Sequence, residues 1–281
     1  MVEGPEATYQ AAYLKKYFAG RRLTHIKIKD GRYKHHGPPA NYRTFIGALP
    51  LRLLDVGNKG KALFLLFEGG WVIIAKLGMA GWFYRPTDKP WFEPRPNIVF
   101  DFQGSSSSSI SQLFYSDFRN FGTLTFTQNM MTVLTEYNSI AEDIFSEKAT
   151  WHHLESLIKA LQATHPRMTI DTLLMDQQLL VSGIGNIIKS ELLYDARISP
   201  RRTLVSLRPT EWQTILTAAR RFAKRTLAIL EHAGQSAQQD YSAYVSIRQV
   251  YNKTHDKLNN KVAQYMSADG RKTYWVPAIQ H

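Results

Sequence analysis

The stretch Met175–Pro200 reads MDQQLLVSGIGNIIKSELLYDARISP, with two apolar segments on either side of Gly183-Ile184-Gly185-Asn186. Glycines allow a close backbone approach, and the amides at the start of the next helix form a site for phosphate. Asn186 can cap that helix or donate a hydrogen bond. The stretch therefore predicts either a phosphate-binding turn between two helices or an ordinary helix–turn–helix corner.

Helical periodicity surrounds this turn and predicts a helical domain. After Gly234, the segments VAQYM and KTYWV read as strands, and the Asp269-Gly270 pair between them is typical of a hairpin turn. We therefore predict a helical domain with a terminal β-hairpin. Its predicted helices span residues 151–162, 170–177, 187–196 and 210–233.

The first half of the chain has a different pattern. Residues 5–19 predict an amphipathic helix closed by Gly20, and residues 22–127 predict a β-sandwich or barrel. The run GSSSSS at 104–109 is interpreted as a flexible hairpin loop. The predicted strands are LTHIKI, LRLLDV, ALFLLF, WVIIAKL, GWFYRP, NIVFDF, LFYSDF and TLTF.

Composition limits the class of protein. With 281 residues the chain is long enough for two domains. It contains no cysteine, which excludes disulfides, cysteine-ligated zinc, iron–sulfur clusters and thiol catalysis. The nine histidines show no grouping with the spacing of metal ligands, so we predict neither a metal nor a cofactor. No run of 18 apolar residues and no signal sequence is evident, so we expect a soluble, intracellular protein without a membrane partner.

The charge is strongly positive and unevenly placed. The formal net charge is +12, and residues 201–281 hold 13 Lys/Arg against 5 Asp/Glu. A basic surface of this size favours a polyanionic partner, of which nucleic acid is the commonest. The alternative is a solvated cationic surface with no specific partner.

The chain opens with MVEGPE, which places carboxylates at Glu3 and Glu6 around a Gly-Pro pair. By itself this is an acidic helix start, with Pro5 near the first turn and Glu6 at the positive helix end. That interpretation leaves Val2 and Glu3 without a role.

Five motifs, in order, resemble the Fpg/Nei family of DNA glycosylases over essentially the whole chain. The opening MVEGPE is similar to the family's N-terminal signature, and DQ-x5-GIGN is similar to its helix–two-turn–helix element. Between them stand NKGKALF, KLGMAGW and YSDFRNFG, at 58–64, 76–82 and 115–122. The resemblance implies a bifunctional glycosylase and AP lyase in base excision repair.

The family's catalytic residues match positions of this chain. After removal of Met1, Val2 would present an α-amine, of which about a tenth is unprotonated at pH 7 because its pKa is roughly 7.7–8.0. Such an amine can attack C1′ and form a Schiff base, which permits β- and δ-elimination. The resemblance assigns the acid/base role to Glu3, a supporting role to Glu6, and phosphate contact with assistance in catalysis to Lys61. The alternative for Lys61 is a surface lysine on a strand.

The resemblance also assigns residues that contact DNA. Met79, Arg119 and Phe121 match the three side chains that fill the gap left by a flipped base. For Met79 and Phe121 the alternative is core packing on strands. Asn186 and Arg271 match residues that hold phosphates.

The chain departs from the family pattern at three points. Valine replaces the usual proline at position 2. The hairpin lacks the four zinc-binding cysteines and resembles the zincless finger of certain Nei-like enzymes, including those of giant viruses, with packing by Tyr265, Tyr274 and Trp275 in place of the metal. Finally, AGQSAQQDY at 233–241 is followed by only ten residues, SAYVSIRQVY, which is shorter than the lesion-capping loop of the Fpg branch.

We predict an α+β protein of two domains. Residues 1–135 form a catalytic β-sandwich with an N-terminal helix, and residues 150–281 form a helix–two-turn–helix domain whose zincless β-hairpin finger spans about 245–281. Damaged DNA, as duplex, bubble or single strand, is the predicted partner of a monomer located at DNA in the nucleus, nucleoid or viral replication site. The rival predictions are a damaged-DNA-binding protein without catalysis and a general nucleic-acid-binding module.

Overall fold

The computed structural model describes residues 2–281 except 89, 91–92, 94, 105–109 and 234–244. The chain forms two compact units, each described here by itself. The first holds Val2, Glu6–Ser139 and the end of helix α8 from Leu230. The second holds Glu3–Pro5, Ile140–Ile229 and the described residues from 245 onward. Most of the predicted GSSSSS loop and of the AGQSAQQDY stretch lies outside the described residues.

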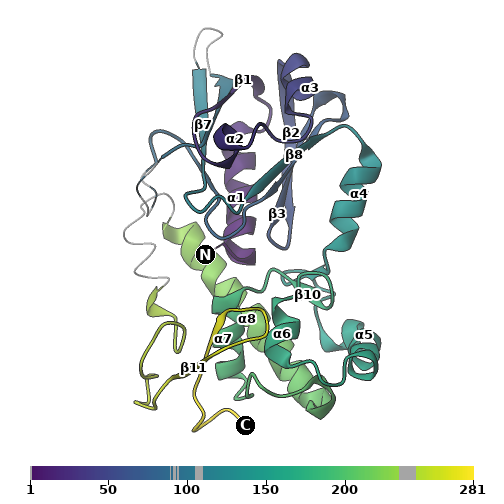
Figure 1. Cartoon of the computed structure of the whole chain (residues 1–281), viewed down its shortest axis with the longest axis vertical. Helices are drawn as coiled ribbons and strands as arrows, with labels where there is room; N and C mark the ends of the chain where they lie inside the picture. The colour runs from purple at the N-terminus through teal and green to yellow at the C-terminus, as the bar shows by residue number, and fades with distance from the viewer. Residues whose placement is uncertain (1, 89, 91–92, 94, 105–109, 234–244) are drawn as a thin grey trace. The chain divides into compact units, whose positions relative to one another are not determined.

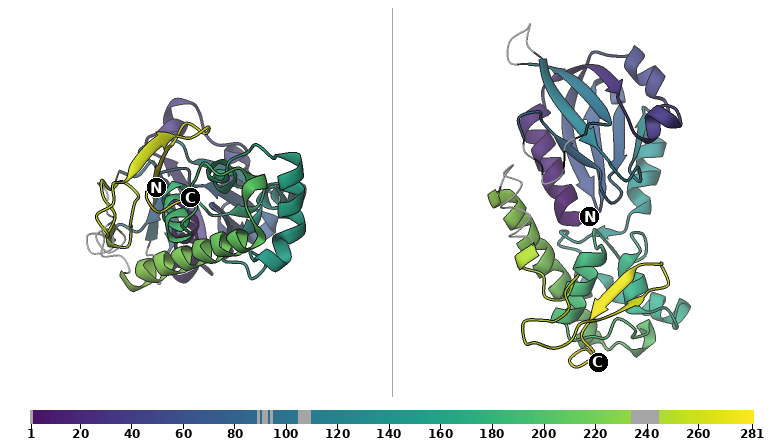
Figure 2. Two further views of the ribbon diagram at one scale, coloured as in Figure 1. Left: turned by 90° about the horizontal axis from the view of Figure 1, so that it is seen from below. Right: turned by 60° about the vertical axis from the view of Figure 1, so that its left-hand side comes forward.

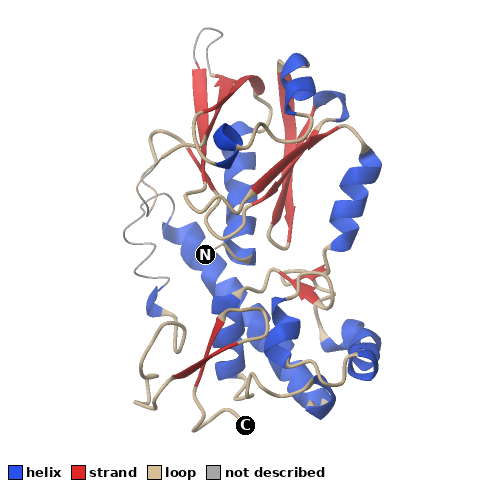
Figure 3. Ribbon diagram, viewed as in Figure 1, coloured by secondary structure: helices blue, strands red, loops and turns tan. Residues whose placement is uncertain are grey.

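Eight antiparallel strands build the first unit, in the order β5-β7-β6-β1-β2-β3-β4-β8 (Figures 1 and 3). Each predicted strand run overlaps one of them. The strands are β1 (Arg22–Ile28), β2 (Leu51–Lys59), β3 (Ala62–Phe67), β4 (Val72–Lys76), β5 (Trp82–Tyr84), β6 (Ile98–Gln103), β7 (Ile110–Ser116) and β8 (Thr123–Thr127).

One apolar cluster fills this unit. It joins buried side chains of α1 (Gly4–Phe18), such as Leu14 and Phe18, to inward-facing residues of both halves of the sheet. The register shifts within β1 and within β2, at Leu23/His25 and Leu53/Asp55. Such irregularities bend a sheet and allow its two halves to close over one core. The predicted sandwich is confirmed.

Three helices of the first unit are absent from the sequence prediction: α2 (Arg32–His35), α3 (Tyr42–Gly47) and α4 (Met130–Ser139). None of the side chains of α4 is buried. The apolar residues Met130, Val133, Leu134 and Tyr137 do have helical spacing, a signal that the sequence analysis did not use. A short 3₁₀ turn, η1 (Glu68–Gly70), precedes β4.

The second unit is helical, as predicted. Its helices are α5 (Trp151–Thr164), α6 (Ile170–Met175), α7 (Asn186–Asp195) and α8 (Pro209–Ala233), with the 3₁₀ turn η2 (Leu204–Ser206). A two-residue parallel pair of β9 (Glu142–Asp143) and β10 (Val181–Ser182), which the sequence did not predict, holds the segment before the GIGN turn.

The terminal hairpin consists of β11 (Ala263–Met266) and β12 (Lys272–Trp275), with Ala263 opposite Trp275 and Met266 opposite Lys272. Gly270 has φ +73°, which the predicted Asp-Gly turn requires. Strand β12 packs along α7. Figure 2 shows the hairpin in yellow from two further sides. Among the described residues, no helix has the length and apolar character needed to cross a membrane.

Candidate active site

Glu3 is completely buried at the first turn of α7. Its Oε1 accepts a hydrogen bond of 2.8 Å from the amide of Ile187, and its Oε2 accepts one of 3.0 Å from the amide of Ile188. These amides form the positive end of the helix, where a carboxylate is stabilised. Both oxygens of Glu3 therefore have a fixed direction.

The glycines of the GIGN turn make room for the chain's own N-terminal segment. A Cβ atom on Gly185 would lie 2.2 Å from Glu3 Oε1. Gly183 has φ +91°, and its carbonyl accepts a hydrogen bond of 2.7 Å from the amide of Gly4. The close approach predicted for this turn is thus observed, with Glu3 and Gly4 as the approaching groups. The amides of Ile187 and Ile188 at the start of α7, which were expected to bind phosphate, donate instead to Glu3.

Val2 precedes this carboxylate directly in the chain and is itself buried. Its backbone nitrogen donates a hydrogen bond of 3.2 Å to the carbonyl of Met79. This contact lies within the first unit, and it brings the second residue of the chain to one of the predicted gap-filling residues.

Two of the three predicted gap-filling side chains contact each other. Arg119 Nη1 lies 3.7 Å from the sulfur of Met79, and Arg119 is exposed. Phe121 is 60% exposed, so core packing is excluded for this side chain. Met79 is half-buried.

The loop that carries Arg119 and Phe121 is braced from within. Buried Asp117 accepts a hydrogen bond of 2.6 Å from the amide of Gly122, and burial raises the pKa of its carboxyl. Gly78 has φ +59°, and a Cβ atom there would lie 2.8 Å from the Gly122 nitrogen. The two loops therefore pack backbone to backbone.

The remaining predicted catalytic residues lie in the first unit. Lys61 is half-buried in the turn between β2 and β3, directly before the first residue of β3. This position is compatible with both the predicted catalytic role and the alternative of a surface lysine. Glu6 is buried in the first turn of α1, a position that fits both a helix start and a supporting role.

Asn186 contacts the hairpin at Lys272, the residue that follows Arg271. Asn186 is buried, and its Nδ2 donates a hydrogen bond of 2.9 Å to the carbonyl of Lys272. Arg271 is exposed, while its carbonyl accepts a hydrogen bond of 2.8 Å from the amide of Ser267. The residue that begins α7 therefore fixes the position of the strand that follows Arg271.

A buried polar network that the sequence analysis missed joins the hairpin to α6 and α7. Asp171 Oδ2 accepts hydrogen bonds of 2.7 Å from both the Tyr265 hydroxyl and the Ser267 hydroxyl. Lys189 Nζ donates one of 2.8 Å to the Thr273 hydroxyl, which also contacts Ser267. Asp171, Lys189 and Thr273 are almost fully buried.

Burial and the hydrogen bonds of this network shift the pKa values of Asp171 and Lys189. Burial raises the pKa of Asp171, but hydrogen bonds from Thr169, Ser267 and Tyr265 outweigh it, and the net direction is downward. Burial lowers the pKa of Lys189, and the charge of Asp171 opposes that effect. The lysine inside the apolar run IIKSELL is the sequence signal by which this network could have been found, but the sequence analysis did not use it.

The segment that precedes the hairpin is anchored by Glu191. Glu191 is buried on α7, and its carboxylate accepts hydrogen bonds of 2.7, 3.1 and 2.8 Å from the amides of Gln249, Val250 and Tyr251.

The aromatic packing predicted for the hairpin is present in part: Tyr274 packs on a cluster of Val250, Val262 and Val276. The chain has no cysteine, and the described residues contain no group of side chains suited to a metal ion. A cysteine-ligated zinc therefore does not fit this hairpin.

Comparison with known families matches both units. Residues 1–124 match the formamidopyrimidine-DNA glycosylase N-terminal domain, and residues 140–238 match the formamidopyrimidine-DNA glycosylase H2TH domain. A formamidopyrimidine-DNA glycosylase of Wolbachia pipientis is 27% identical over 236 residues, which cover 81% of each chain. One of Shouchella clausii is 33% identical over 193 residues, which cover 66% of this chain and 62% of that one.

Solved structures share the fold. MutM (Fpg) of Thermus thermophilus has a TM-score of 0.77 and 25% identity, with 99% of this chain and 98% of that chain covered. Fpg of Lactococcus lactis, in complex with DNA that contains an oxidised pyrimidine, has a TM-score of 0.80 at 21% identity, with 99% of both chains covered.

Proposed function

We propose a catalytic route for this chain from one premise: it belongs to the Fpg/MutM family of DNA glycosylases. It is a DNA glycosylase with AP lyase activity, which acts on oxidised bases in base excision repair. The proposal concerns which residues perform each step and which lesions are preferred.

The nucleophile in this proposal is the α-amine of Val2, exposed by removal of Met1. Its nitrogen forms a bond to C1′, and the damaged base leaves with the electrons of the glycosidic bond. The resulting Schiff base makes the neighbouring C2′ proton acidic, so the phosphates on either side leave by β- and δ-elimination. A primary amine such as that of valine can form this imine.

Glu3 is the proposed acid/base that assists opening of the deoxyribose ring. The observation that carries this assignment is its pair of hydrogen bonds to the amides of Ile187 and Ile188, one residue from Val2. These bonds hold the carboxylate of the residue that follows Val2 in one orientation, and a group held in place transfers protons effectively.

DNA contacts complete the proposal. Met79, Arg119 and Phe121 would fill the space that the flipped nucleotide leaves. The Arg119–Met79 contact and the exposure of Phe121 support this role. Lys61, Asn186 and Arg271 would hold phosphates, and Glu6 would support the N-terminal segment.

The hairpin is proposed to work as a finger without zinc. In place of a metal, the network of Asp171, Lys189, Ser267 and Thr273 would hold the hairpin against α6 and α7. The carboxylate of Glu191 would hold the segment that precedes it. This arrangement supports the Nei-like assignment.

Borohydride trapping tests the nucleophile and the acid together. Oligonucleotides containing an abasic site should be trapped covalently, with the adduct on the N-terminal peptide that starts at Val2. Glu3→Gln should reduce base excision by roughly 10²–10⁴-fold, the range of general acid/base catalysis. Glu147→Gln, a change of an exposed carboxylate, is the matched control and should keep normal rates.

Two outcomes contradict this route. Active protein that retains Met1 would remove the α-amine of Val2 from the mechanism. Tight binding to lesion DNA without trapping or excision would favour the alternative function, a damaged-DNA-binding protein without catalysis.

Lesion preference is a separate proposal. The similar proteins and structures reported above are named formamidopyrimidine-DNA glycosylase or Fpg, whereas the preference proposed for this chain is Nei-like. Only ten residues separate Tyr241 from Asn252, which is short for a loop that grips 8-oxoguanine. Oxidised pyrimidines and hydantoins should therefore be excised much faster than 8-oxoguanine paired with cytosine, because lost polar contacts change discrimination by orders of magnitude. Single-turnover rates on matched duplexes measure this. Equal rates would contradict the Nei-like preference and assign the capping role to another loop, such as residues 85–95.

A further inference from the structure

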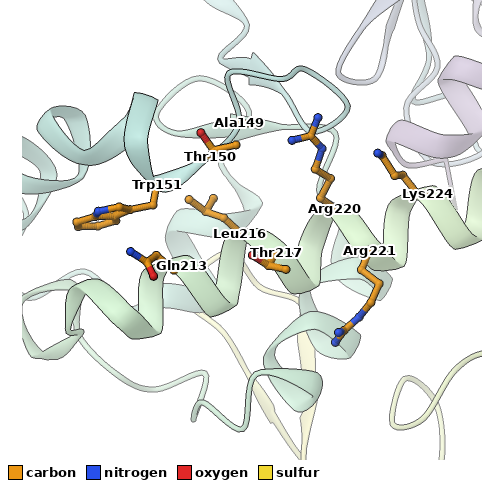
Figure 4. Close-up of a pocket in the computed structure, with 9 residues that line it drawn as sticks. All are labelled: Ala149, Thr150, Trp151, Gln213, Leu216, Thr217, Arg220, Arg221 and Lys224. Atoms are coloured by element: carbon orange, nitrogen blue, oxygen red, sulfur yellow. The ribbon is translucent and has the colours of Figure 1, made fainter.

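A pocket of about 640 Å³ lies in the helical unit between the start of α5 and one side of α8 (Figure 4). Ala149, Thr150 and Trp151 form one wall. Gln213, Leu216, Thr217, Arg220, Arg221 and Lys224 of α8 form the other. The volume is within the range of small-molecule sites, roughly 300–1,000 Å³. None of the residues placed above in catalysis or DNA contact lines it.

The pocket is positively charged. Its described lining contains three cations and no carboxylate. Arg220 and Lys224, one helical turn apart, extend from the same side of α8, whereas Arg221 extends away from them (Figure 4) and pairs with Asp195 at 3.1 Å. Arg220 is half-buried and Lys224 is exposed. The outer nitrogens of a guanidinium and an ammonium can donate charge-assisted hydrogen bonds to an anion in the pocket.

The rest of the lining suits an organic group. The side chains of Trp151 and Leu216 are apolar, and the Trp151 ring is half-buried. Gln213, Thr150 and Thr217 can form hydrogen bonds with a polar ring edge. A flat aromatic group beside an indole, with an anion at a guanidinium and an ammonium, is the chemistry of a nucleotide.

We propose that this pocket binds a nucleotide, with its phosphate on Arg220 and Lys224 and its base against Trp151. The site is distinct from the proposed catalytic residues, and its occupant is either a free mononucleotide or a nucleotide at a strand end. The two sources share the same contacts and differ only in what continues from the sugar.

Binding to the full-length protein tests this site, with thymidine 5′-monophosphate as the probe in calorimetry. Thymidine, which lacks the phosphate, and inorganic phosphate, which lacks the base, should each bind more weakly. Arg220→Gln/Lys224→Gln should weaken binding of the probe by about tenfold or more, the effect of losing a charge-assisted hydrogen bond. Trp151→Leu should weaken binding of the probe but not of inorganic phosphate.

The matched control is Arg167→Gln/Arg225→Gln, which removes the same charge from two exposed residues outside the pocket. This variant should bind the probe like the wild type. If both double variants bind the probe equally weakly, the binding is non-specific ionic attraction, and the proposal is overturned. Absence of probe binding to the wild type would overturn it as well.

A competition experiment identifies the source of the nucleotide. If a 5′-phosphorylated thymidine octamer displaces the probe, and Arg220→Gln/Lys224→Gln reduces its affinity in parallel, the pocket receives a strand end. If the octamer does not displace a probe that binds through Arg220 and Lys224, the ligand is a free nucleotide. Melting curves of the double variant should stay close to those of the wild type, because Lys224 is exposed and Arg220 is only half-buried.

Discussion

At the scale of single residues, Gly185 decides where Glu3 can lie. An alanine Cβ at this position would stand 2.2 Å from Glu3 Oε1 and 2.4 Å from its carboxyl carbon. Gly185→Ala should therefore displace the carboxylate from the amides of α7 and lower base excision by about 10²-fold, the lower end of general acid/base effects. Single-turnover excision of an oxidised pyrimidine measures the change.

Gly47→Ala is the matched control, because a Cβ atom there meets no atom within 4 Å. This control should retain wild-type excision. DNA affinity of Gly185→Ala should stay near that of the wild type, since none of the proposed phosphate contacts is altered. Normal excision by Gly185→Ala would show that Glu3 does not need its position at α7.

At the scale of elements, the hairpin depends on Asp171. Asp171→Asn replaces an oxygen that accepts from Tyr265 and Ser267 with an amide group, so the free energy of unfolding should fall by about 2 kcal/mol. Because the pKa of Asp171 is lowered from 3.8 in the folded protein, its stabilisation is complete above pH 3.8 and is lost as the pH falls through the folded pKa. Denaturant unfolding at pH 7 and at pH 3 measures both effects.

The difference between wild type and Asp171→Asn should shrink at pH 3. Asp30→Asn, in an exposed pair with His35, is the control and should change stability little. The same Asp171 variant should lower DNA affinity, because the hairpin carries Arg271. Unchanged stability and unchanged affinity together would show that the polar network does not hold the finger.

At the scale of the whole molecule, the net charge of +12 sets the response to salt. The affinity of such a protein for DNA falls steeply as the salt concentration rises. Each phosphate that the protein neutralises adds about 0.9 to the slope of log affinity against log salt. Arg271→Gln should reduce the slope of log affinity against log salt by about 0.9 and weaken binding to all lesions alike. Fluorescence anisotropy at several salt concentrations measures it.

Arg43→Gln removes the same charge from an exposed residue of α3 and should leave the slope unchanged. A changed lesion preference at constant slope would instead place Arg271 at the damaged base. The comparison separates a phosphate contact from the general attraction of a basic protein.

The sequence alone determined the features that depend on local chemistry. Strand alternation and helical periodicity predicted the β-sandwich and the helical unit, since each follows from which side of an element is buried. Asp269-Gly270 predicted the hairpin turn because glycine readily adopts the positive φ that such a turn requires. Gly270 has this positive φ in the structure. The absence of cysteine excluded a cysteine-ligated zinc, because composition alone decides whether thiolate ligands exist.

Only the tertiary structure decided how distant groups meet. Glu3 accepts hydrogen bonds from residues 184 and 185 positions away, and no local pattern encodes that distance. Likewise, Lys189 is buried against Thr273, although a lysine on a helix normally lies in solvent. Sequence patterns report which side of an element is buried, while the partner that buries it is settled by the packing of the whole unit.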